Sequence, residues 1–367
     1  MRFLDRIKRP TLLLDEIKCR RNIAMMASKA RSSSVRFRPH FKTHQSLAIG
    51  EWFRDEGVSS ITVSSVIMAR HFASNGWKDI TIAFPLNIRE AEDVRELSLR
   101  TDINILASNN EHLSLIKNVF KGKAGCFIKI NTGNNRSGTE WDDSEEIMRI
   151  AERLTGSEYL RMAGFLTHAG HAYKASSINE IIEIYNDTLK KLQFVNALFP
   201  GAGRIISSGD TPSCSVVENF RGLDEIRPGN FVFYDLTQEK LGTCKADQIA
   251  VAVACPVVEK NKRKREIIIY GGGVHLSKES LTLSDSRKVF GQIAIPEKNG
   301  WIFPDEDVYL RSVSQEHGII SAPGSFFDSI DPGDLVCVIP VHSCMTADIL
   351  REYHTFDGKV ISDLSPK

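Results

Sequence analysis

The feature that most constrains this chain is an alternation of short apolar runs with amphipathic stretches between residues 35 and 235. The stretches between the runs, such as 87–100 and 177–199, repeat apolar residues at three- and four-residue spacing, as amphipathic helices do. Eight strands joined by crossover helices predict an α/β fold, a (β/α)8 TIM barrel. The runs predicted to be strands are 35–41, 60–64, 79–84, 102–107, 126–131, 161–167, 204–208 and 231–235.

The pattern changes after about residue 240. Apolar runs at 248–261, 264–272, 307–320 and 333–342 are separated by turn residues, and no long helical periodicity appears among them. This predicts a C-terminal, mostly-β domain. We expect a barrel domain over 12–238 and a β domain over 239–367, with residues 1–11 packing against the latter.

Composition limits the class of partner. The formal net charge of the 367 residues is +1, so the broad positive field needed for nucleic acid or an anionic membrane is absent. No apolar run reaches membrane-spanning length, and MRFLDRIKRP lacks the apolar core of a signal peptide. The seven cysteines form no Cys-x-x-Cys pair, which argues against a disulfide framework. We expect a cytoplasmic protein that binds a small molecule.

Unusual residues follow the predicted strands, where a barrel of this kind assembles its active site. Lys42 follows the first strand, and an amine desolvated at a barrel mouth can lose its proton and condense with a carbonyl. The loop 208–213 after the seventh strand is rich in glycine and hydroxyl groups and precedes a predicted short helix at 214–220, a setting that suits a phosphate. Arg136 lies in a Gly- and Asn-rich loop and is a candidate donor to a cofactor ring.

Six segments carry a family resemblance: RPHFKTH, THAGHAY, SGDTPS, EIRPGNFVFYD, SQEHG and PVHSCMTAD. In this order they resemble the D-serine dehydratase and D-threonine aldolase family of fold-type III, alanine racemase-like enzymes. The resemblance implies pyridoxal 5'-phosphate (PLP) held as a Schiff base on Lys42, a head-to-tail homodimer and a divalent metal beside the substrate. The predicted cofactor-binding residues are Lys42, His40, Arg136, His168, Tyr173, Ser208, Gly209, Asp210, Thr211 and Tyr234.

The metal is expected on His342 and Cys344. Residues two apart in an extended strand point to the same face, so both side chains can bind one ion. A thiolate with an imidazole favours Zn²⁺ over harder cations such as Mn²⁺ or Mg²⁺, and two protein ligands leave positions open for water and substrate. Dehydratase-like relatives carry His-x-Cys, whereas many aldolase-like relatives carry His-x-Asp, so Cys344 favours β-elimination. His317, in SQEHG, is the second predicted catalytic residue after Lys42.

These residues predict a PLP-dependent lyase that converts a small D-β-hydroxy amino acid to a keto acid and ammonia. Retro-aldol cleavage to glycine and an aldehyde is the nearest alternative. A racemase needs a second base, which we do not identify, and a non-catalytic PLP-homeostasis protein leaves the β domain with its metal pair unexplained. Asp210 stands where relatives usually have Ser, and Tyr270 to Gly273 stand where they often have Asp-Ala-Gly, so substrate choice can differ.

Overall fold

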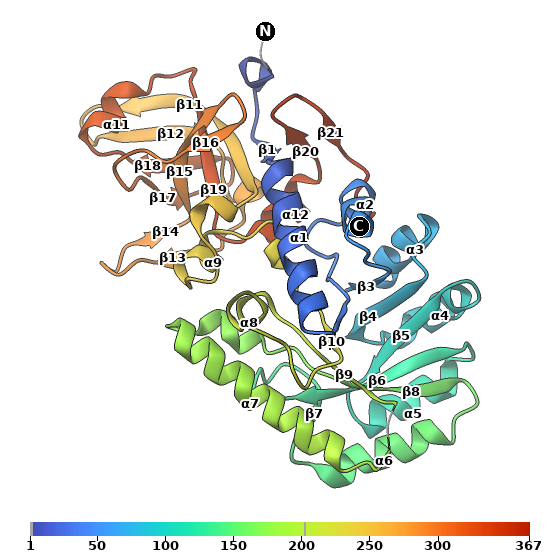
Figure 1. The fold of residues 1–367 in the computed structure, drawn as a ribbon. Coiled ribbons are helices and arrows are strands. Elements are labelled where there is room, and N and C mark those ends of the chain that lie inside the picture. The colour runs from blue at the N-terminus through green and yellow to red at the C-terminus, as the bar shows by residue number, and fades with distance from the viewer. Residues whose placement is uncertain (1–2, 202) are drawn as a thin grey trace. The chain divides into compact units, whose positions relative to one another are not determined.

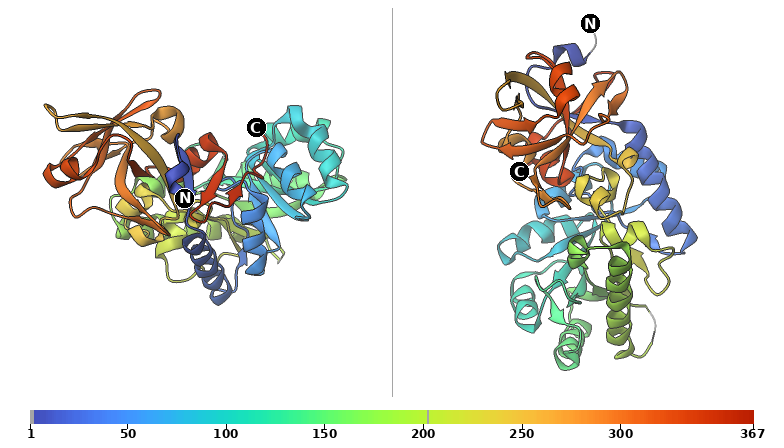
Figure 2. Two further views of the ribbon diagram at one scale, coloured as in Figure 1. Left: turned by 90° about the horizontal axis from the view of Figure 1, so that it is seen from above. Right: turned by 90° about the vertical axis from the view of Figure 1, so that its left-hand side faces the viewer.

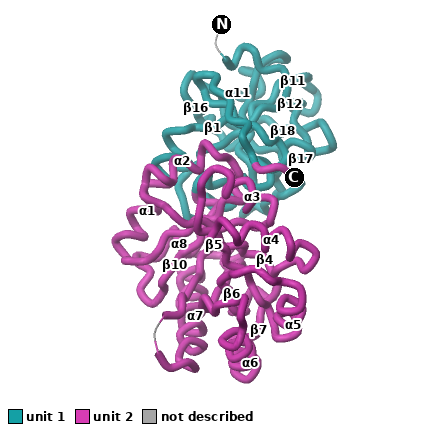
Figure 3. The backbone as a smooth tube through the Cα atoms, turned by 90° about the vertical axis from the view of Figure 1, so that its right-hand side faces the viewer, with its two compact units in different colours: residues 1–22, 232–364 teal, residues 23–231, 365–367 magenta. Residues whose placement is uncertain are grey.

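The computed structural model describes residues 3–201 and 203–367 (Figure 1). Its internal packing separates two compact units, shown in different colours in Figure 3. The barrel unit comprises residues 23–231 and 365–367, and the β unit comprises residues 1–22 and 232–364. The domain limits expected from the sequence, 12–238 and 239–367, stay predictions.

Eight parallel strands of the barrel unit follow one another in the order β2-β10-β9-β8-β6-β5-β4-β3, and the short strand β7 (Thr139–Glu140) pairs with β6 off this path. A bridge between His40 and Thr62 joins the two edges, with the Phe41 N–H donating to the Thr62 carbonyl at 2.8 Å. The predicted barrel is thereby confirmed. Its strands are β2 (Arg36–Phe37), β3 (Ser60–Val63), β4 (Asp79–Pro85), β5 (Asp102–Ala107), β6 (Ala124–Asn131), β8 (Leu160–Leu166), β9 (Ile205–Ser208) and β10 (Glu225–Ile226).

Helices alternate with these strands and lie outside the sheet (Figures 1 and 2). Most begin at a Ser, Asn or Asp whose side chain accepts a backbone N–H of the first turn, as Ser65, Asn109 and Ser177 do, so helix starts are fixed by local sequence. None of the helices in the described ranges is both long and apolar enough to cross a membrane. They are α1 (Glu16–Ser32), α2 (Leu47–Asp55), α3 (Val66–Ser74), α4 (Ala91–Ser98), α5 (Asn110–Val119), α6 (Ser144–Thr155), α7 (Ile178–Ala197) and α8 (Thr211–Val216).

The eighth strand was placed wrongly from the sequence. It is β10, whereas the predicted run 231–235 ends a short 3-10 helix (Asn230–Val232) and leads into α9 (Leu236–Lys240). Pro228 cannot donate to a strand ladder, and Tyr234 has a φ of 50°, which no strand residue adopts. The run is apolar because it is buried, and a short buried run does not distinguish a strand from a buried turn.

The β unit is built on a ten-stranded sheet of order β12-β18-β17-β15-β19-β11-β1-β20-β21, with β16 paired to β15. The predicted mostly-β C-terminal region is confirmed. The N-terminal strand β1 pairs antiparallel with β11, so residues 11–14 belong to this sheet. Its strands are β1 (Thr11–Leu14), β11 (Val251–Asn261), β12 (Glu266–Tyr270), β15 (Gly291–Glu297), β16 (Gly300–Ile302), β17 (Tyr309–Val313), β18 (His317–Ser321), β19 (Leu335–Pro340), β20 (Tyr353–Thr355) and β21 (Val360–Ile361).

Candidate active site

Lys42 lies on a turn directly after the bridge residue His40, at the C-terminal end of the first barrel strand. Its backbone N–H donates to His40 Nδ1 at 3.4 Å. The preceding Phe41 is fully buried, with its ring 5.0 Å from that of Phe53 and 5.1 Å from that of Trp77, so the turn is anchored from within. The Lys42 side chain itself is exposed. The structure of the chain alone therefore does not show the burial that we expected for this amine.

Two partly buried histidines lie at the same barrel mouth. Burial, followed by the Lys42 charge, lowers the pKa of His168 to about 3 and holds the pKa of His40 well below its usual value. The positive charges of Arg136 and Arg227 also lower the pKa of both histidines. Three cationic side chains, those of Lys42, Arg136 and Arg227, are therefore close enough to act on both imidazoles. Neutral His168 has Nδ1 at 3.2 Å from the Gly209 carbonyl, so Nδ1 carries the proton.

Arg227 was not predicted as a site residue. It is 4% exposed, and its Nε–H donates to Ser207 Oγ at 2.7 Å, while Nη2 donates to the Thr167 carbonyl. A Cβ on Gly209 would lie 2.3 Å from the Arg227 backbone nitrogen, so only glycine permits this close approach. The signal was present in the sequence: with the strand placed at 225–226, Arg227 is the first residue after its C-terminal end.

Lys129 is the second residue that the sequence argument missed. It lies in β6, is 6% exposed, and donates from Nζ to Ser137 Oγ. Burial, assisted by the charges of Arg136 and Arg227, lowers the pKa of Lys129 to about 8. The sequence did not indicate which way the Lys129 side chain points, because the alternation of residues alone does not show which face of β6 lies inside the barrel.

The predicted phosphate loop, residues 208–213, is buried. The helix α8 begins within it at Thr211, three residues earlier than expected. Asp210 Oδ1 accepts the Ser213 N–H at 2.8 Å, so the carboxylate caps its own helix. The Thr211 N–H donates to Tyr173 Oη at 3.4 Å, which joins two predicted cofactor residues. Burial raises the pKa of Asp210 to about 6.

Replacing Asp210 by Asn is expected to stabilise the protein at pH 7.5 by roughly 2 kcal/mol, since a folded pKa above the usual value of 3.8 costs stability as pH rises through 6. Asn keeps the capping acceptor without the charge. Urea unfolding at pH 7.5 and pH 4.5 measures the effect. The gain should shrink at the lower pH, and a gain independent of pH would contradict a buried, titrating carboxyl.

Tyr234 and His317 belong to the β unit, whereas the other predicted cofactor-binding residues belong to the barrel unit. Tyr234 is 1% exposed, and His317 is exposed at the start of β18, opposite Tyr270 of β12. Their assigned roles, like those of the other predicted site residues, stay predictions.

His342 and Cys344 do meet, although not in a strand. β19 ends at Pro340, His342 is the N-cap residue of α12 (Ser343–Leu350), and Cys344 lies in its first turn, so the strand argument for their shared face was wrong. Burial lowers the pKa of His342, but a hydrogen bond with Cys344 and the charges of Cys344, Asp235 and Glu279 outweigh it and raise this pKa to about 9. Asp235 Oδ2 accepts the Ser343 N–H at 3.0 Å and fixes the start of the helix.

This donor set has the chemistry of a zinc site, an imidazole nitrogen beside a thiolate sulfur. Within residues 3–201 and 203–367, no group of three or more His, Cys, Asp or Glu side chains is arranged to hold a metal. The pair therefore provides two ligands, and His342 must lose its proton before it can bind an ion.

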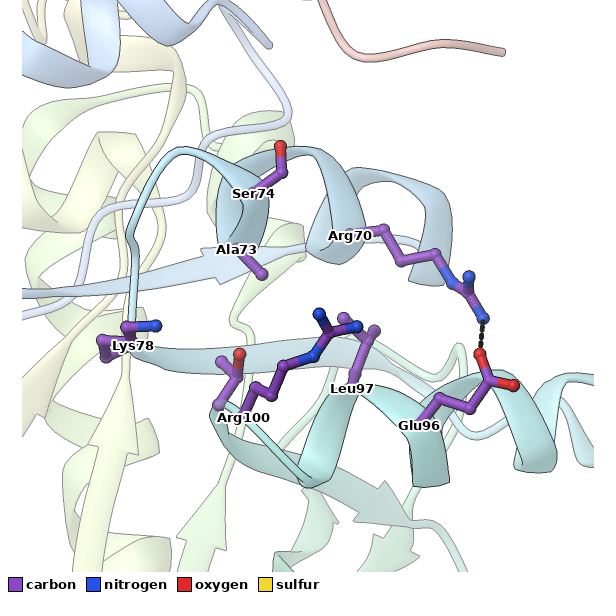
Figure 4. A pocket seen from close by; sticks show the side chains of 8 residues that line it. Arg70, Ala73, Ser74, Lys78, Glu96, Leu97 and Arg100 are labelled. Atoms are coloured by element: carbon purple, nitrogen blue, oxygen red, sulfur yellow. Dashed lines mark hydrogen bonds and ion pairs between the residues drawn. The ribbon is translucent and has the colours of Figure 1, made fainter.

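A pocket of about 360 Å³ lies between α3 and α4, at the other end of the barrel (Figure 4). Lys78 and Thr101 in its wall directly precede β4 and β5, so the pocket opens at the N-terminal ends of the strands. Lys42 follows a C-terminal end. The pocket is thus separate from the candidate site.

Comparison with known proteins agrees with this arrangement. The family model of the alanine racemase N-terminal domain matches residues 14–236, more than half of the chain. The chain belongs to this family. A model of the serine dehydratase domain matches residues 250–356, so this alanine racemase family member resembles the dehydratases in its second part as well.

Relatives of this family member match it over nearly the whole length. D-serine dehydratase of Dictyostelium discoideum is 27% identical over 99% of this chain and 97% of its own. D-threo-3-hydroxyaspartate dehydratase of Delftia sp. strain HT23 is 27% identical over 96% and 95%. A solved metal-free variant of D-threo-3-hydroxyaspartate dehydratase, 24% identical, has a TM-score of 0.92 over 100% of both chains and confirms the fold. The resemblance inferred from the six segments is thereby confirmed.

Proposed function

We propose that this protein is a PLP-dependent lyase that converts a small D-β-hydroxy amino acid to a keto acid and ammonia in a metal-dependent β-elimination. The observation that carries the proposal is the position of Lys42. It is an exposed amine at the C-terminal end of a barrel strand, beside neutral His40 and His168 and within electrostatic reach of the same imidazoles as Arg136 and Arg227. The names of the dehydratase relatives support the substrate class.

The charge at the barrel mouth and the close packing of its phosphate loop support PLP binding there. Arg136, Arg227 and Lys42 complement the negative charge of a phosphorylated pyridine, and the lack of room for a Cβ at Gly209 keeps the backbone of this loop close to Arg227. Loop residues 208–211 are the proposed phosphate-binding segment. When bound, PLP supplies an aldehyde for amines and an electron sink at the substrate α-carbon.

Three side chains of the barrel unit have separate proposed roles. Lys42 Nζ would hold the cofactor, and its free amine would remove the substrate α-proton as a general base. Neutral His168 is held in place by its hydrogen bond to the Gly209 carbonyl, so its ring borders the site without adding a positive charge. Arg227, held by Ser207 and Thr167, provides a fixed donor toward the cofactor ring.

His342 and Cys344 would hold the metal, which we propose to be Zn²⁺ because of the thiolate. A divalent cation supplies Lewis acidity, which makes a hydroxyl a better leaving group. The contact between the two side chains supports this assignment. The cytoplasmic location and the homodimer implied by the resemblance remain part of the proposal, and a sedimentation measurement tests the dimer.

A substrate panel tests the proposal. The purified protein is incubated with PLP and D-serine, D-threonine or D-3-hydroxyaspartate, with and without a chelator, and keto acid, ammonia, glycine and racemised substrate are measured. We expect keto acid and ammonia in equal amounts, lost on chelation and restored by Zn²⁺. Glycine plus aldehyde would assign retro-aldol cleavage instead. PLP binding with no turnover of any substrate would assign a PLP-homeostasis role.

A further inference from the structure

The barrel unit contains a buried network of charged and polar side chains that connects to Arg227, and the other members of this network have no role in the proposed reaction. Arg38 donates from Nη1 and Nη2 to the two oxygens of Asp79 at 2.6 and 2.8 Å, and from Nε to Glu225 Oε2 at 2.5 Å. The other Glu225 oxygen accepts the Ser207 hydroxyl at 2.7 Å, and Ser207 Oγ accepts the Arg227 Nε–H at 2.7 Å. The network thus leads from β4 to Arg227 at the mouth.

Burying the charged side chains of this network costs free energy. Arg38 is 1% exposed, Glu225 is 0% exposed and Ser207 is 0% exposed. A buried ion pair is seldom more stable than apolar residues of the same volume, and barrel interiors are ordinarily filled with branched apolar side chains. Stability alone therefore gives no reason for charges here, whereas the fixing of a functional side chain does.

Strand register explains why the network of hydrogen bonds ends on Arg227. Ser207 of β9 and Glu225 of β10 are direct register partners, so their side chains lie next to each other on one face. Arg227, two residues after Glu225, projects to the same face. With Nε–H held by Ser207 and Nη2 by the Thr167 carbonyl, the guanidinium has one direction instead of many.

We infer that Ser207 and Glu225 are positioning residues for PLP, because they hold and charge-balance the Arg227 guanidinium. This inference rests on the proposed function, in which PLP lies at this barrel mouth. Ser207 provides the link, because its hydroxyl accepts from Arg227 and donates to Glu225 at once. Its loss removes the Nε anchor of the guanidinium and its connection to Glu225, and leaves only the carbonyl contacts of Nη2.

The test uses the full-length protein with Ser207→Ala, which removes only the linking hydroxyl and leaves the pairs among Arg38, Asp79 and Glu225 intact. PLP affinity is measured by titration of the apoprotein, and the absorption band of bound PLP is followed against pH. We expect PLP to dissociate about 10- to 100-fold more readily, the range for a lost hydrogen bond to a charged group. The pH midpoint of the band should rise, since positive charge held near the Lys42 nitrogen disfavours its protonation.

Two further variants decide between positioning and general damage. Ser207→Thr keeps a hydroxyl and should restore both affinity and midpoint toward wild type. Ser60→Ala removes another buried barrel serine, in β3, and should change neither. The inference is overturned if Ser207→Ala matches wild type in both readouts, or if Ser207→Thr is as impaired as Ser207→Ala. Failure of the wild-type protein to bind PLP at all would instead overturn the proposed function.

Discussion

Lys42→Ala is expected to abolish turnover, with a loss of about 10⁴-fold or more, because the residue both attaches the cofactor and moves the α-proton. The protein should also lose the absorption band of lysine-bound PLP. Its fold should be unchanged, since the side chain is exposed and the turn is anchored by Phe41 instead. Steady-state rates with the best substrate of the panel, together with the spectrum, measure both effects.

Lys78→Ala is the matched control for this prediction. It also removes an exposed lysine of the barrel unit, but at the N-terminal end of β4. Rate and spectrum should stay at wild-type values. Turnover by Lys42→Ala within tenfold of wild type would show that another group carries the chemistry.

Cys344→Ala should give the second largest effect. Removing one of two protein ligands is expected to deplete the metal, and the rate of β-elimination should fall by about 100-fold or more, equivalent to roughly 3 kcal/mol of transition-state stabilisation. The spectrum of bound PLP should persist, because Cys344 is a proposed metal ligand and is not among the proposed cofactor-binding residues. Metal analysis and steady-state kinetics measure the result.

Met345→Ala changes the exposed neighbour of Cys344 in α12 and serves as its control. It should retain metal and activity. Wild-type activity in metal-depleted Cys344→Ala would show that the reaction does not depend on the metal.

How far the sequence predicted the fold depended on the kind of signal in each segment. Seven barrel strands were found near their observed positions, because strand runs and helical periodicity alternate clearly. The eighth was missed since Phe231 to Tyr234 are buried in turns, and buried turns are as apolar as strands. That single error hid Arg227.

The site was less predictable where distant segments meet. The link from Arg38 to Glu225 joins residues 187 positions apart, and no local pattern predicts it. Capping by Asp210 was local and could have been predicted from an Asp followed by Pro212 at the start of a helix. His342 and Cys344 contact each other through the first turn of a helix and not along a strand, and their role as metal ligands stays a prediction.

The central claim is tested most directly by borohydride reduction of the PLP-loaded protein followed by peptide mapping. Reduction fixes the cofactor on the amine that holds it. We expect a single modified peptide, with the added mass on Lys42. A label on another lysine, or a protein that takes up no label after incubation with PLP, would contradict it.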